Sequence, residues 1–408
     1  MASADGARVL RDLRHLRTIG AYKTGVHRPT LSAEHVAALH WLKGELEAIG
    51  HSTTIDGIGN VIGIADVGGR KVLAGSHLES QNHAGWLDGP LGVVYALEAA
   101  RAVKADPALS GLAVDVGAWC DEEGHFGHFL GSRSAVGEVS EAQIDEARDR
   151  TSGRALRAAL RDAGLAGKPR RAIEPRRYAG YLEAHIEQGD WLEAHGLKIG
   201  IVTSIVGIQQ YRIALEGAQN HAGTTRMAIR RDAGLAAAKL CVAIDERFPK
   251  VAGERTVWTT GRITLDPGAP SVIPGRAEML FQIRDADPAI LARLEAELFA
   301  LAAAADATGP CRVRAELIRK SEPAVMDGAL QAALEAAAET LAPGKHARMP
   351  SGAGHDAQVF AKHMPAAMLF VPSIGGISHH WAENTSDEDI VLGARVFVEA
   401  VVRLLKGP

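Results

Sequence analysis

Residues 71–103, KVLAGSHLESQNHAGWLDGPLGVVYALEAARAV, contain the pattern that decides the fold. An apolar strand is expected over 71–76. A helix is expected over 90–103, and it begins with a proline, which suits a first helical turn. Residues 111–120, GLAVDVGAWC, then form a second buried strand. Strand, helix and strand in this order predict an α/β domain with a mostly parallel sheet.

The same alternation continues on both sides of this stretch. A helix is expected over 32–49, with Ser32 as its N-cap and Gly50 at its end. Towards the C-terminus a strand is expected over 366–371 and a final helix over 387–405. The two ends of the chain therefore belong to one α/β domain.

The middle of the chain changes character. Four strands and two helices are expected in the order β-α-β-β-α-β, at 211–217, 227–248, 255–265, 276–284, 288–305 and 311–318. This order is the split βαβ unit of ferredoxin-like domains. We therefore expect a discontinuous domain made of residues 1–207 and 321–408, interrupted by an inserted domain at 208–320.

Composition excludes several classes of protein. The 408 residues are 47% hydrophobic with a formal net charge of -4, and no apolar run reaches the ~18–20 residues that a membrane span needs. Long basic runs are lacking, so neither nucleic acid nor a membrane surface is an expected partner. Cys120, Cys241 and Cys311 are scattered, which argues against a disulfide framework and fits reduced thiols in the cytoplasm.

Four segments carry residues suited to metal chemistry: GSHLES with GWLDGPLG, AWCDEEGHFG, YLEAHIEQG and GGISHHWAEN. Each alone is a weak signal, because a single histidine at a strand end is most often structural and a cluster of carboxylates is usually a solvated loop. Together they place imidazoles and carboxylates at strand ends and in loops, the ligand types of catalytic zinc and related divalent ions. The candidates are His77, Asp88, Asp121, Glu122, Glu123, His185, His379 and His380.

A pair of ions bridged by one carboxylate would leave another carboxylate as the general base. Glu122 and Glu123, adjacent in the sequence, are the candidates for dividing these two roles. The same ligand types suit several divalent ions, so zinc, manganese, cobalt and nickel all remain open.

Seven motifs follow one another along the chain: GSHLES…GWLDGPLGV, DEEGHFG…LGSR, EAHIEQGDWLE, NHAGTTRM…RRDA, SVIPG…IR, SGAGHDA and GGISHHWAE. Their order resembles that of amidases of the hydantoinase/carbamoylase family, within the aminoacylase/carboxypeptidase superfamily of metallohydrolases. This family includes N-carbamoyl-L-amino-acid hydrolases, β-ureidopropionases and allantoate amidohydrolases. The resemblance extends over nearly the whole chain.

The resemblance implies a zinc-exopeptidase-like catalytic domain, with the inserted domain serving as a lid and as the interface of a homodimer. It implies two divalent ions per subunit, zinc or else manganese, cobalt or nickel. It makes Glu122 the general base that activates a metal-bridged water. The ligands that it implies are His77, Asp88 and His185 for one ion, and Asp88, Glu123 and His379 for the other.

The resemblance also implies roles for residues outside the metal set. His221 in NHAGTT donates a hydrogen bond to the developing oxyanion, acting in trans across the dimer. Arg284 binds a substrate carboxylate, for which a guanidinium fork is well suited. Ser271, Gln188 and His355 complete the residues that we assign to substrate binding.

The chain departs from the family pattern at four positions. Ser271 stands where many relatives have asparagine, and Ile208 where they usually have glutamine. Glu79 replaces an aspartate, although a longer carboxylate still reaches the imidazole of a neighbouring ligand. His380, where relatives have a small residue, is a second candidate ligand. The expected metal set is thus intact, while the set that recognises the carboxylate is altered.

These patterns predict a metal-dependent amidohydrolase that cleaves a linear C–N bond in a carbamoyl, ureido or amidino group of a small carboxylate-bearing molecule. One alternative is a dipeptidase or aminoacylase of the same superfamily, against which NHAGTT and SGAGHDA argue. Another is a non-catalytic binding protein on this fold, which would be expected to lose Glu122 or a ligand.

Overall fold

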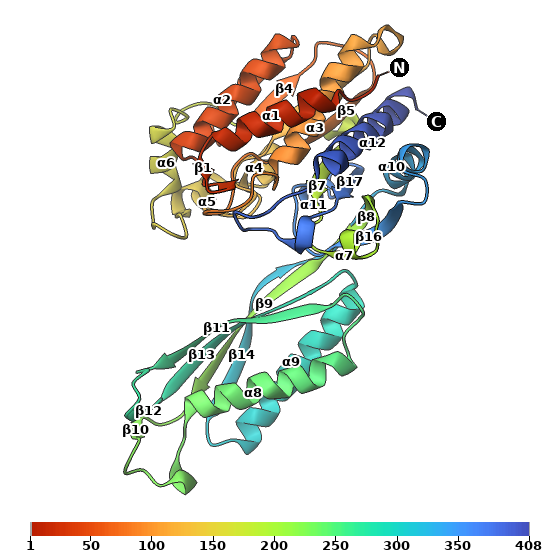
Figure 1. Ribbon diagram of the computed structural model, residues 1–408. Coiled ribbons are helices and arrows are strands. Elements are labelled where there is room, and N and C mark those ends of the chain that lie inside the picture. Colours follow the sequence, from red (N-terminus) through yellow and green to blue (C-terminus); the bar gives the residue numbers. More distant parts are fainter. Residues whose placement is uncertain (1, 408) are drawn as a thin grey trace. The chain divides into compact units, whose positions relative to one another are not determined.

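A computed structural model describes residues 2–407, and Figure 1 shows their helices and strands. The described chain forms two compact units. Ser204–Ala324 forms the small unit, and the rest of the described chain forms the large unit. The large unit is therefore discontinuous in sequence, and the small unit is an insertion within it.

The large unit contains a central sheet with helices packed against it (Figure 1). Its helices are α1 (Gly6–Thr18), α2 (Ala33–Ala48), α3 (Pro90–Ala105), α4 (Leu130–Ala135), α5 (Glu141–Glu146), α6 (Leu156–Asp162), α7 (Trp191–Ala194), α10 (Gly328–Leu341), α11 (Ala357–Phe360) and α12 (Asp387–Lys406). The strands of the sheet are β3 (Ser52–Ile55), β4 (Val61–Ile64), β5 (Lys71–Ser76), β6 (Ala113–Ala118), β7 (Tyr178–Ile186), β8 (Ile199–Ile205), β15 (Ala324–Val325), β16 (His346–Ser351) and β17 (Ala366–Val371). A separate short hairpin pairs β1 (Ala21–Tyr22) with β2 (Gly25–Val26).

The central sheet has the strand order β15-β8-β17-β7-β5-β6-β4-β3, and β16 pairs with β8. Its four middle strands, β17, β7, β5 and β6, run parallel. On either side, β8 and β4 pair antiparallel with this parallel centre. The central sheet is thus mixed, with a parallel centre between antiparallel outer pairs.

The sequence explains the middle of this sheet. Every residue of β5, β6 and β17 is buried, as expected for parallel strands with both faces covered. Helices α1, α3 and α12 pack against one another, and α3 and α12 also pack against the strands. The N-cap Ser32 accepts a hydrogen bond from the backbone N–H of His35, which confirms the predicted start of α2.

The small unit has the predicted element order. Its elements are β9 (Gly207–Glu216), β10 (Asn220–His221), α8 (Ala233–Arg247), β11 (Val257–Asp266), β12 (Val272–Ile273), β13 (Arg276–Asp285), α9 (Pro288–Thr308) and β14 (Arg312–Ser321). The four long strands form an antiparallel sheet in the order β11-β13-β9-β14. One helix boundary was wrong: α8 begins at Ala233 rather than at 227, because the side chain of Asp232 caps it by accepting from Leu235 N–H.

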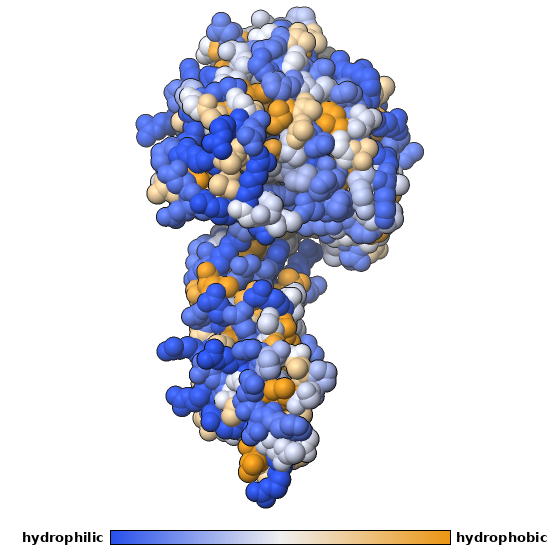
Figure 2. Space-filling view, turned by 90° about the vertical axis from the view of Figure 1, so that its left-hand side faces the viewer, coloured by the Kyte–Doolittle hydropathy of each residue, from blue (hydrophilic) through white to orange (hydrophobic). Residues whose placement is uncertain are grey.

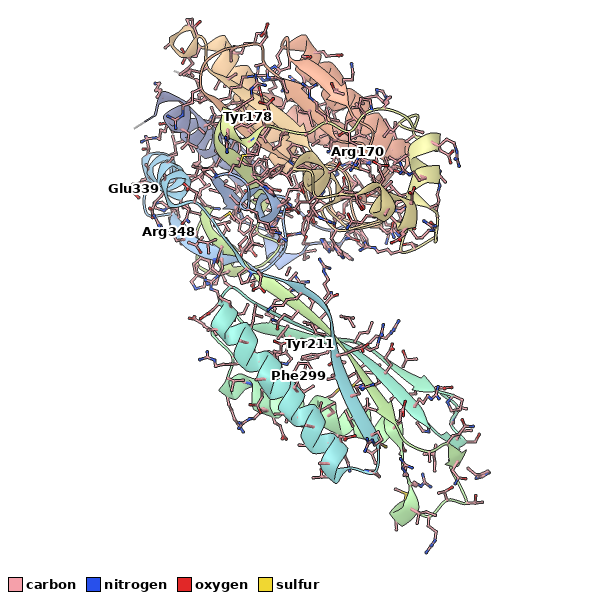
Figure 3. All side chains as sticks on the ribbon, turned by 180° about the vertical axis from the view of Figure 1, so that it is seen from behind. Arg170, Tyr178, Tyr211, Phe299, Glu339 and Arg348 are labelled. Atoms are coloured by element: carbon pink, nitrogen blue, oxygen red, sulfur yellow. The ribbon has the colours of Figure 1, made fainter. Side chains whose placement is uncertain are left out.

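Helices α8 and α9 cover one face of the small sheet. Alternate residues of β9, Tyr211, Ile213 and Leu215, belong to the core beneath them. The Tyr211 ring meets Phe299 of α9 edge-on at 6.0 Å between centroids, and Figure 3 shows both side chains between strand and helix. The other face of this sheet carries the alternate, more polar residues of the same strands.

The surface view agrees with the composition. In Figure 2, hydrophilic side chains cover most of the visible face, with hydrophobic patches scattered among them. Within residues 2–407, no helix combines the length and the apolar character that crossing a membrane requires.

Candidate functional site

The candidate residues of the large unit meet at the carboxyl ends of its parallel strands. His77 directly follows β5, and Glu122 and Glu123 lie just after β6. His185 is the last residue but one of β7. Because β5 lies between β6 and β7, these strand ends form one edge of the sheet, the usual place for ligands in α/β proteins.

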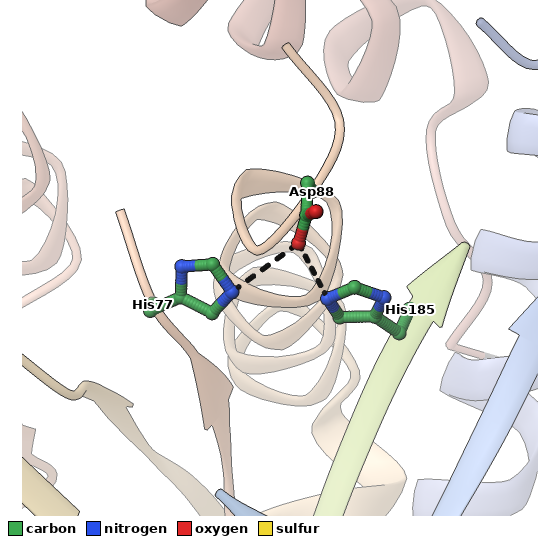
Figure 4. Close-up of side chains that lie close together, drawn as sticks. All are labelled: His77, Asp88 and His185. Atoms are coloured by element: carbon green, nitrogen blue, oxygen red, sulfur yellow. Dashed lines mark ion pairs between the residues drawn. The ribbon is translucent and has the colours of Figure 1, made fainter. Parts of the chain in front are cut away.

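The carboxylate of Asp88 lies at the centre of the cluster. Its Oδ1 is 3.5 Å from His77 Nε2 and 3.1 Å from His185 Nε2. Figure 4 shows the two imidazoles on either side of this oxygen. The other oxygen, Oδ2, is 3.3 Å from His379 Nε2. Asp88 thus offers one oxygen to each of two groups of ligands, as a bridging carboxylate does.

Two groups of candidate ligands lie close together. Ligand atoms of His77, Asp88 and His185 lie within 4.8 Å of one another, and so do those of Asp88, Glu123 and His379. In the second group, the carboxylate of Glu123 accepts hydrogen bonds from Gln81, through the backbone N–H at 3.1 Å and the side-chain amide at 2.5 Å. Gln81 therefore orients the carboxylate of Glu123.

Hydrogen bonds define the tautomers of two histidines. His77 Nδ1 lies 3.1 Å from the carbonyl oxygen of Glu79, and His185 Nδ1 lies 2.9 Å from that of Ile186. A carbonyl only accepts, so each Nδ1 carries a hydrogen, and it is Nε2 that faces Asp88 and carries the lone pair in the neutral form of the ring. This is the arrangement of a metal-binding histidine oriented by its other nitrogen.

The charge balance fits the binding of cations. His77 Nε2 is buried and has no hydrogen-bond partner among the described residues. Burial lowers the pKa of His77, yet the carboxylates of Glu122, Asp88 and Glu79 outweigh it and raise this pKa well above its usual value. Besides the ligand groups, the buried acids near the cluster are Glu79, Glu183, Asp356 and Glu383. Such a concentration of buried negative charge requires compensating positive charge.

Glu122 lies beside the first group. Its Oε2 is 3.7 Å from His77 Nε2, and its side chain is 10% exposed, so it borders the cluster without belonging to either group. Burial raises the pKa of Glu122 well above its usual value; the neighbouring carboxylates of Glu123 and Asp356 act in the same direction, and His77 opposes them. A perturbed carboxyl next to a ligand cluster is typical of a catalytic acid or base.

Glu79 links Glu122 to helix α2. Its Oε1 accepts the backbone N–H of Glu122 at 2.7 Å, and its Oε2 lies 3.4 Å from His35 Nε2. His35 Nδ1 accepts the N–H of Leu31 at 3.0 Å, so Nε2 carries the hydrogen that faces Glu79. The sequence reasoning noticed Glu79 but assigned no role to His35, whose partner lies in a distant segment.

Glu383 is a site residue that the sequence reasoning missed. Its Oε1 accepts the backbone N–H groups of Leu87 at 3.2 Å and Asp88 at 3.1 Å. Ser378 Oγ lies 3.0 Å from Glu383 Oε2 and 3.3 Å from Asp88 Oδ2. A Cβ added to Gly85 would lie 1.8 Å from Glu383, so this glycine makes room for the carboxylate. The only signal in the sequence was a single acid inside GGISHHWAEN.

Two predicted substrate residues also lie in the large unit. Gln188 donates from its side-chain amide to Asp88 Oδ2 at 2.9 Å, and its own backbone has a φ of 60°. His355 is buried, with its ring edge-on to His185 at 4.6 Å between centroids. Gln188 thus contacts the cluster directly, while His355 packs against one of its imidazoles.

Comparison with known proteins decides the family. The model of peptidase family M20/M25/M40 matches residues 72–403. The chain is 46% identical to a crystal structure of an amidase of the hydantoinase/carbamoylase family from Burkholderia phymatum, with a TM-score of 0.92 and coverage of 100% of this chain and 99% of that one. The chain belongs to this amidase family.

Curated relatives agree with the assignment. The amidase is 33% identical to an allantoate amidohydrolase of Bacillus subtilis, over 93% of each chain. It is 32% identical to an N-carbamoyl-L-amino acid amidohydrolase of Geobacillus stearothermophilus, over 98% of this chain and 99% of that one. Its enzyme class, a hydrolase of C–N bonds other than peptide bonds, follows from this membership, which confirms the expected class.

The remaining predicted residues of the amidase lie in the small unit. His221 pairs with Val272 in the short ribbon of β10 and β12, and Ala222 N–H donates to the carbonyl of Ser271. NHAGTT and SVIPG are therefore neighbours in space. Arg284 lies apart from them on β13, where its Nε donates to Gln282 Oε1 at 2.6 Å.

The exposed ring of His221 is oriented by its own loop. Its Nδ1 accepts the backbone N–H groups of Gly223 at 3.0 Å and Thr224 at 3.2 Å. A nitrogen that accepts two hydrogen bonds carries no hydrogen, so the neutral ring has its N–H at Nε2. The loop thus presents His221 as a hydrogen-bond donor to whatever faces Nε2.

His380, the additional candidate ligand, belongs to neither group of ligands in the described chain. Its ring packs against that of Trp381, tilted by 36° with 4.6 Å between centroids, and its Nδ1 accepts the N–H of Ala382. His379, its neighbour, reaches the cluster with a backbone φ of 53°, in the left-handed region that few side chains adopt.

Proposed function

We propose that this amidase hydrolyses a linear C–N bond in an N-carbamoyl, ureido or amidino group of a small molecule that carries a carboxylate. The observation that carries the proposal is the double ligand cluster around Asp88, with the carboxylate of Glu122 beside it. The names of the relatives support the bond type: allantoate amidohydrolase, N-carbamoyl-L-amino acid amidohydrolase and, in rice, ureidoglycolate hydrolase.

The proposal includes two divalent ions per subunit, zinc or else manganese, cobalt or nickel. His77, Asp88 and His185 would hold one, and Asp88, Glu123 and His379 would hold the other. When bound, the ions supply positive charge that polarises the scissile carbonyl and makes water easier to deprotonate. Imidazole and carboxylate ligands suit all four metals.

The side chains of the protein then move protons and hold the substrate. Glu122 takes a proton from the attacking water and delivers it to the leaving nitrogen, which is general base and then general acid catalysis. His221 donates its Nε2–H to the oxygen of the attacked carbonyl group, on which negative charge develops. Arg284 binds the carboxylate of the substrate. In this proposal the large unit is the zinc-exopeptidase-like catalytic domain, and the small unit serves as lid and dimer interface.

A substrate panel tests the proposal. Enzyme reconstituted with each divalent metal is offered N-carbamoyl-α-amino acids, ureido acids, allantoate and dipeptides, with release of ammonia or of amino groups as the readout. Turnover of ureido or carbamoyl compounds with dipeptides left intact is the expected result. Preferential cleavage of dipeptides would establish the dipeptidase alternative, and binding without turnover of any compound would establish a binding protein.

We predict that His221 acts in trans in a homodimer. Glu122→Gln and His221→Ala homodimers should both be nearly inactive. After reversible dissociation and mixing, half of the dimers are mixed, and each mixed dimer holds one site without either substitution. Roughly a quarter of the wild-type activity should therefore return under two-fold pairing. Subunit exchange, followed by mass spectrometry of tagged chains, with no return of activity would contradict this prediction.

We predict that Ser271→Asn improves the hydrolysis of N-carbamoyl-α-amino acids, because an amide offers two donor hydrogens where the hydroxyl offers one. The same change should weaken turnover of the natural type of substrate found in the panel. Steady-state kcat/KM for both substrates measures the effect, with Ser271→Ala as the matched control. Unchanged values for both substrates would show that Ser271 has no part in recognition.

A further inference from the structure

The open face of the small sheet can be divided into two halves along its strands. In the half that contains Arg212 and Arg262, these two arginines are paired with acids. Arg212 contacts Glu278 at 3.4 Å and Glu316 at 2.8 Å, and Arg262 contacts Glu278 at 2.7 Å. The two guanidinium groups and the two carboxylates neutralise one another, so these arginines need no bound anion.

The other half carries two arginines among amides. Arg319 of β14 lies in one row with Gln210 of β9 and Gln282 of β13, because both Arg319 and Gln282 pair with Gln210. Arg284 lies in the next row on this face, paired with Ile208. Both arginines are half-buried.

No acid neutralises Arg319 in the described chain. Burial lowers the pKa of its guanidinium, and the charge of Arg284 lowers it further, with no carboxylate acting in the opposite direction. Burial lowers the pKa of Arg284 as well. For Arg319, a half-buried cation with no carboxylate beside it is costly unless an anion joins it.

A β-bulge directs Arg319 to this face. On β14, Val313 and Ala315 pack against the helix-covered core, and alternation would put Arg319 on the same side. The register shifts between Leu317 and Arg319, so Arg319 pairs with Gln210 on the open face instead. Bulges commonly redirect a side chain next to a functional site.

The opposite edge strand bulges in the same row. On β11 the pairing register shifts between Thr260 and Arg262. The last pair before this shift lies in the row of Phe281 and Tyr211, and the register of β14 shifts after the same row. The extra residues of the two bulges, Gly261 and Ile318, line a hollow of about 280 Å³ together with Gln210, Gln282 and Thr259. The hollow adjoins the row of Arg319.

We propose that Arg319 binds a second carboxylate of the substrate, so that the amidase prefers carbamoyl or ureido derivatives of dicarboxylic acids. The proposal rests on the proposed function, in which Arg284 binds the first carboxylate. Strand spacing puts the Cα atoms of Arg284 and Arg319 about 12 Å apart across β9. Two extended arginine side chains that lean towards each other over β9 can therefore contact the two ends of a short dicarboxylate. Each fork matches a carboxylate with two parallel hydrogen bonds.

The test uses a matched pair of compounds, N-carbamoyl-aspartate and N-carbamoyl-asparagine, which have nearly the same size and differ in the second carboxylate. Binding of each to the Glu122→Gln protein is measured by calorimetry, and KM and kcat are measured on wild-type enzyme. The dicarboxylate should bind about 10- to 100-fold more tightly, and Arg319→Gln should abolish this preference. Arg319→Lys should keep part of it.

Arg212→Gln is the control, because it removes an arginine of the same sheet face that is already paired with Glu278 and Glu316. It should leave the preference unchanged. Equal binding of both compounds by the Glu122→Gln parent would overturn the proposal, and so would equal weakening of both by Arg319→Gln. Absence of turnover with either compound would count against the proposed function alone, because the binding preference is measured without turnover.

Discussion

Glu122→Gln is expected to lower kcat by at least about 100-fold and up to ~10⁴-fold, which is the usual contribution of a general base. The amide has nearly the same shape as the carboxylate but cannot accept a proton from water. Glu122 belongs to neither ligand group, so the metal content of the variant should equal that of the wild type. Steady-state kinetics and elemental analysis on the same preparation measure both effects.

The control for this variant is Glu141→Gln. Glu141 is an exposed glutamate paired with Arg157 and Arg170, and it belongs to neither ligand group. Replacement of its carboxylate should leave kcat unchanged. Near-normal turnover in Glu122→Gln would mean that another group is the base. A loss of metal together with activity would instead show that Glu122 is a ligand.

Removal of metal is expected to abolish hydrolysis and to lower the melting temperature. Without cations, the buried carboxylates around Asp88 repel one another, and part of the folding free energy is lost. Zinc, manganese, cobalt or nickel, added one at a time, should restore both properties. Activity, elemental analysis and thermal unfolding of the stripped and restored enzyme measure the effect.

Single ligand variants refine this test. His185 belongs only to the first group and His379 only to the second, so each alanine variant should retain about one ion per subunit instead of two. The His380→Ala variant is the control and should retain both. Full activity in protein shown to be free of metal would contradict the proposed chemistry as a whole.

Local sequence patterns were sufficient to predict most of the helices and strands. Strands 71–76 and 366–371 have the bounds that their apolar composition predicted, and α2 begins after its predicted cap Ser32. Prediction was weaker where a choice depended on a partner far along the chain. The antiparallel strands beside the parallel centre are an example. The late start of α8 at Ala233 has a local cause instead, because its cap is the neighbouring Asp232.

The candidate site shows the same division. Motif order pointed to the histidines and carboxylates of the cluster, because ligand chemistry requires particular residue types. It gave no role to His35 or Glu383, whose contacts with Glu79 and with the backbone of Asp88 join segments dozens to hundreds of residues apart. A buried polar contact of this kind leaves no local period or spacing in the sequence.

The sequence by itself determined the two-part organisation, the order of the elements and the types of ligand available, because caps, hydrophobic periods and residue chemistry act locally. Only the tertiary structure decided which atoms meet. It placed Asp88 between His77 and His185, and it assigned the hydrogens of those rings through carbonyl contacts. It also turned Arg319 to the open face through a bulge that strand alternation does not predict. These features depend on packing and register between distant strands, where a shift of one residue reverses the direction of every side chain.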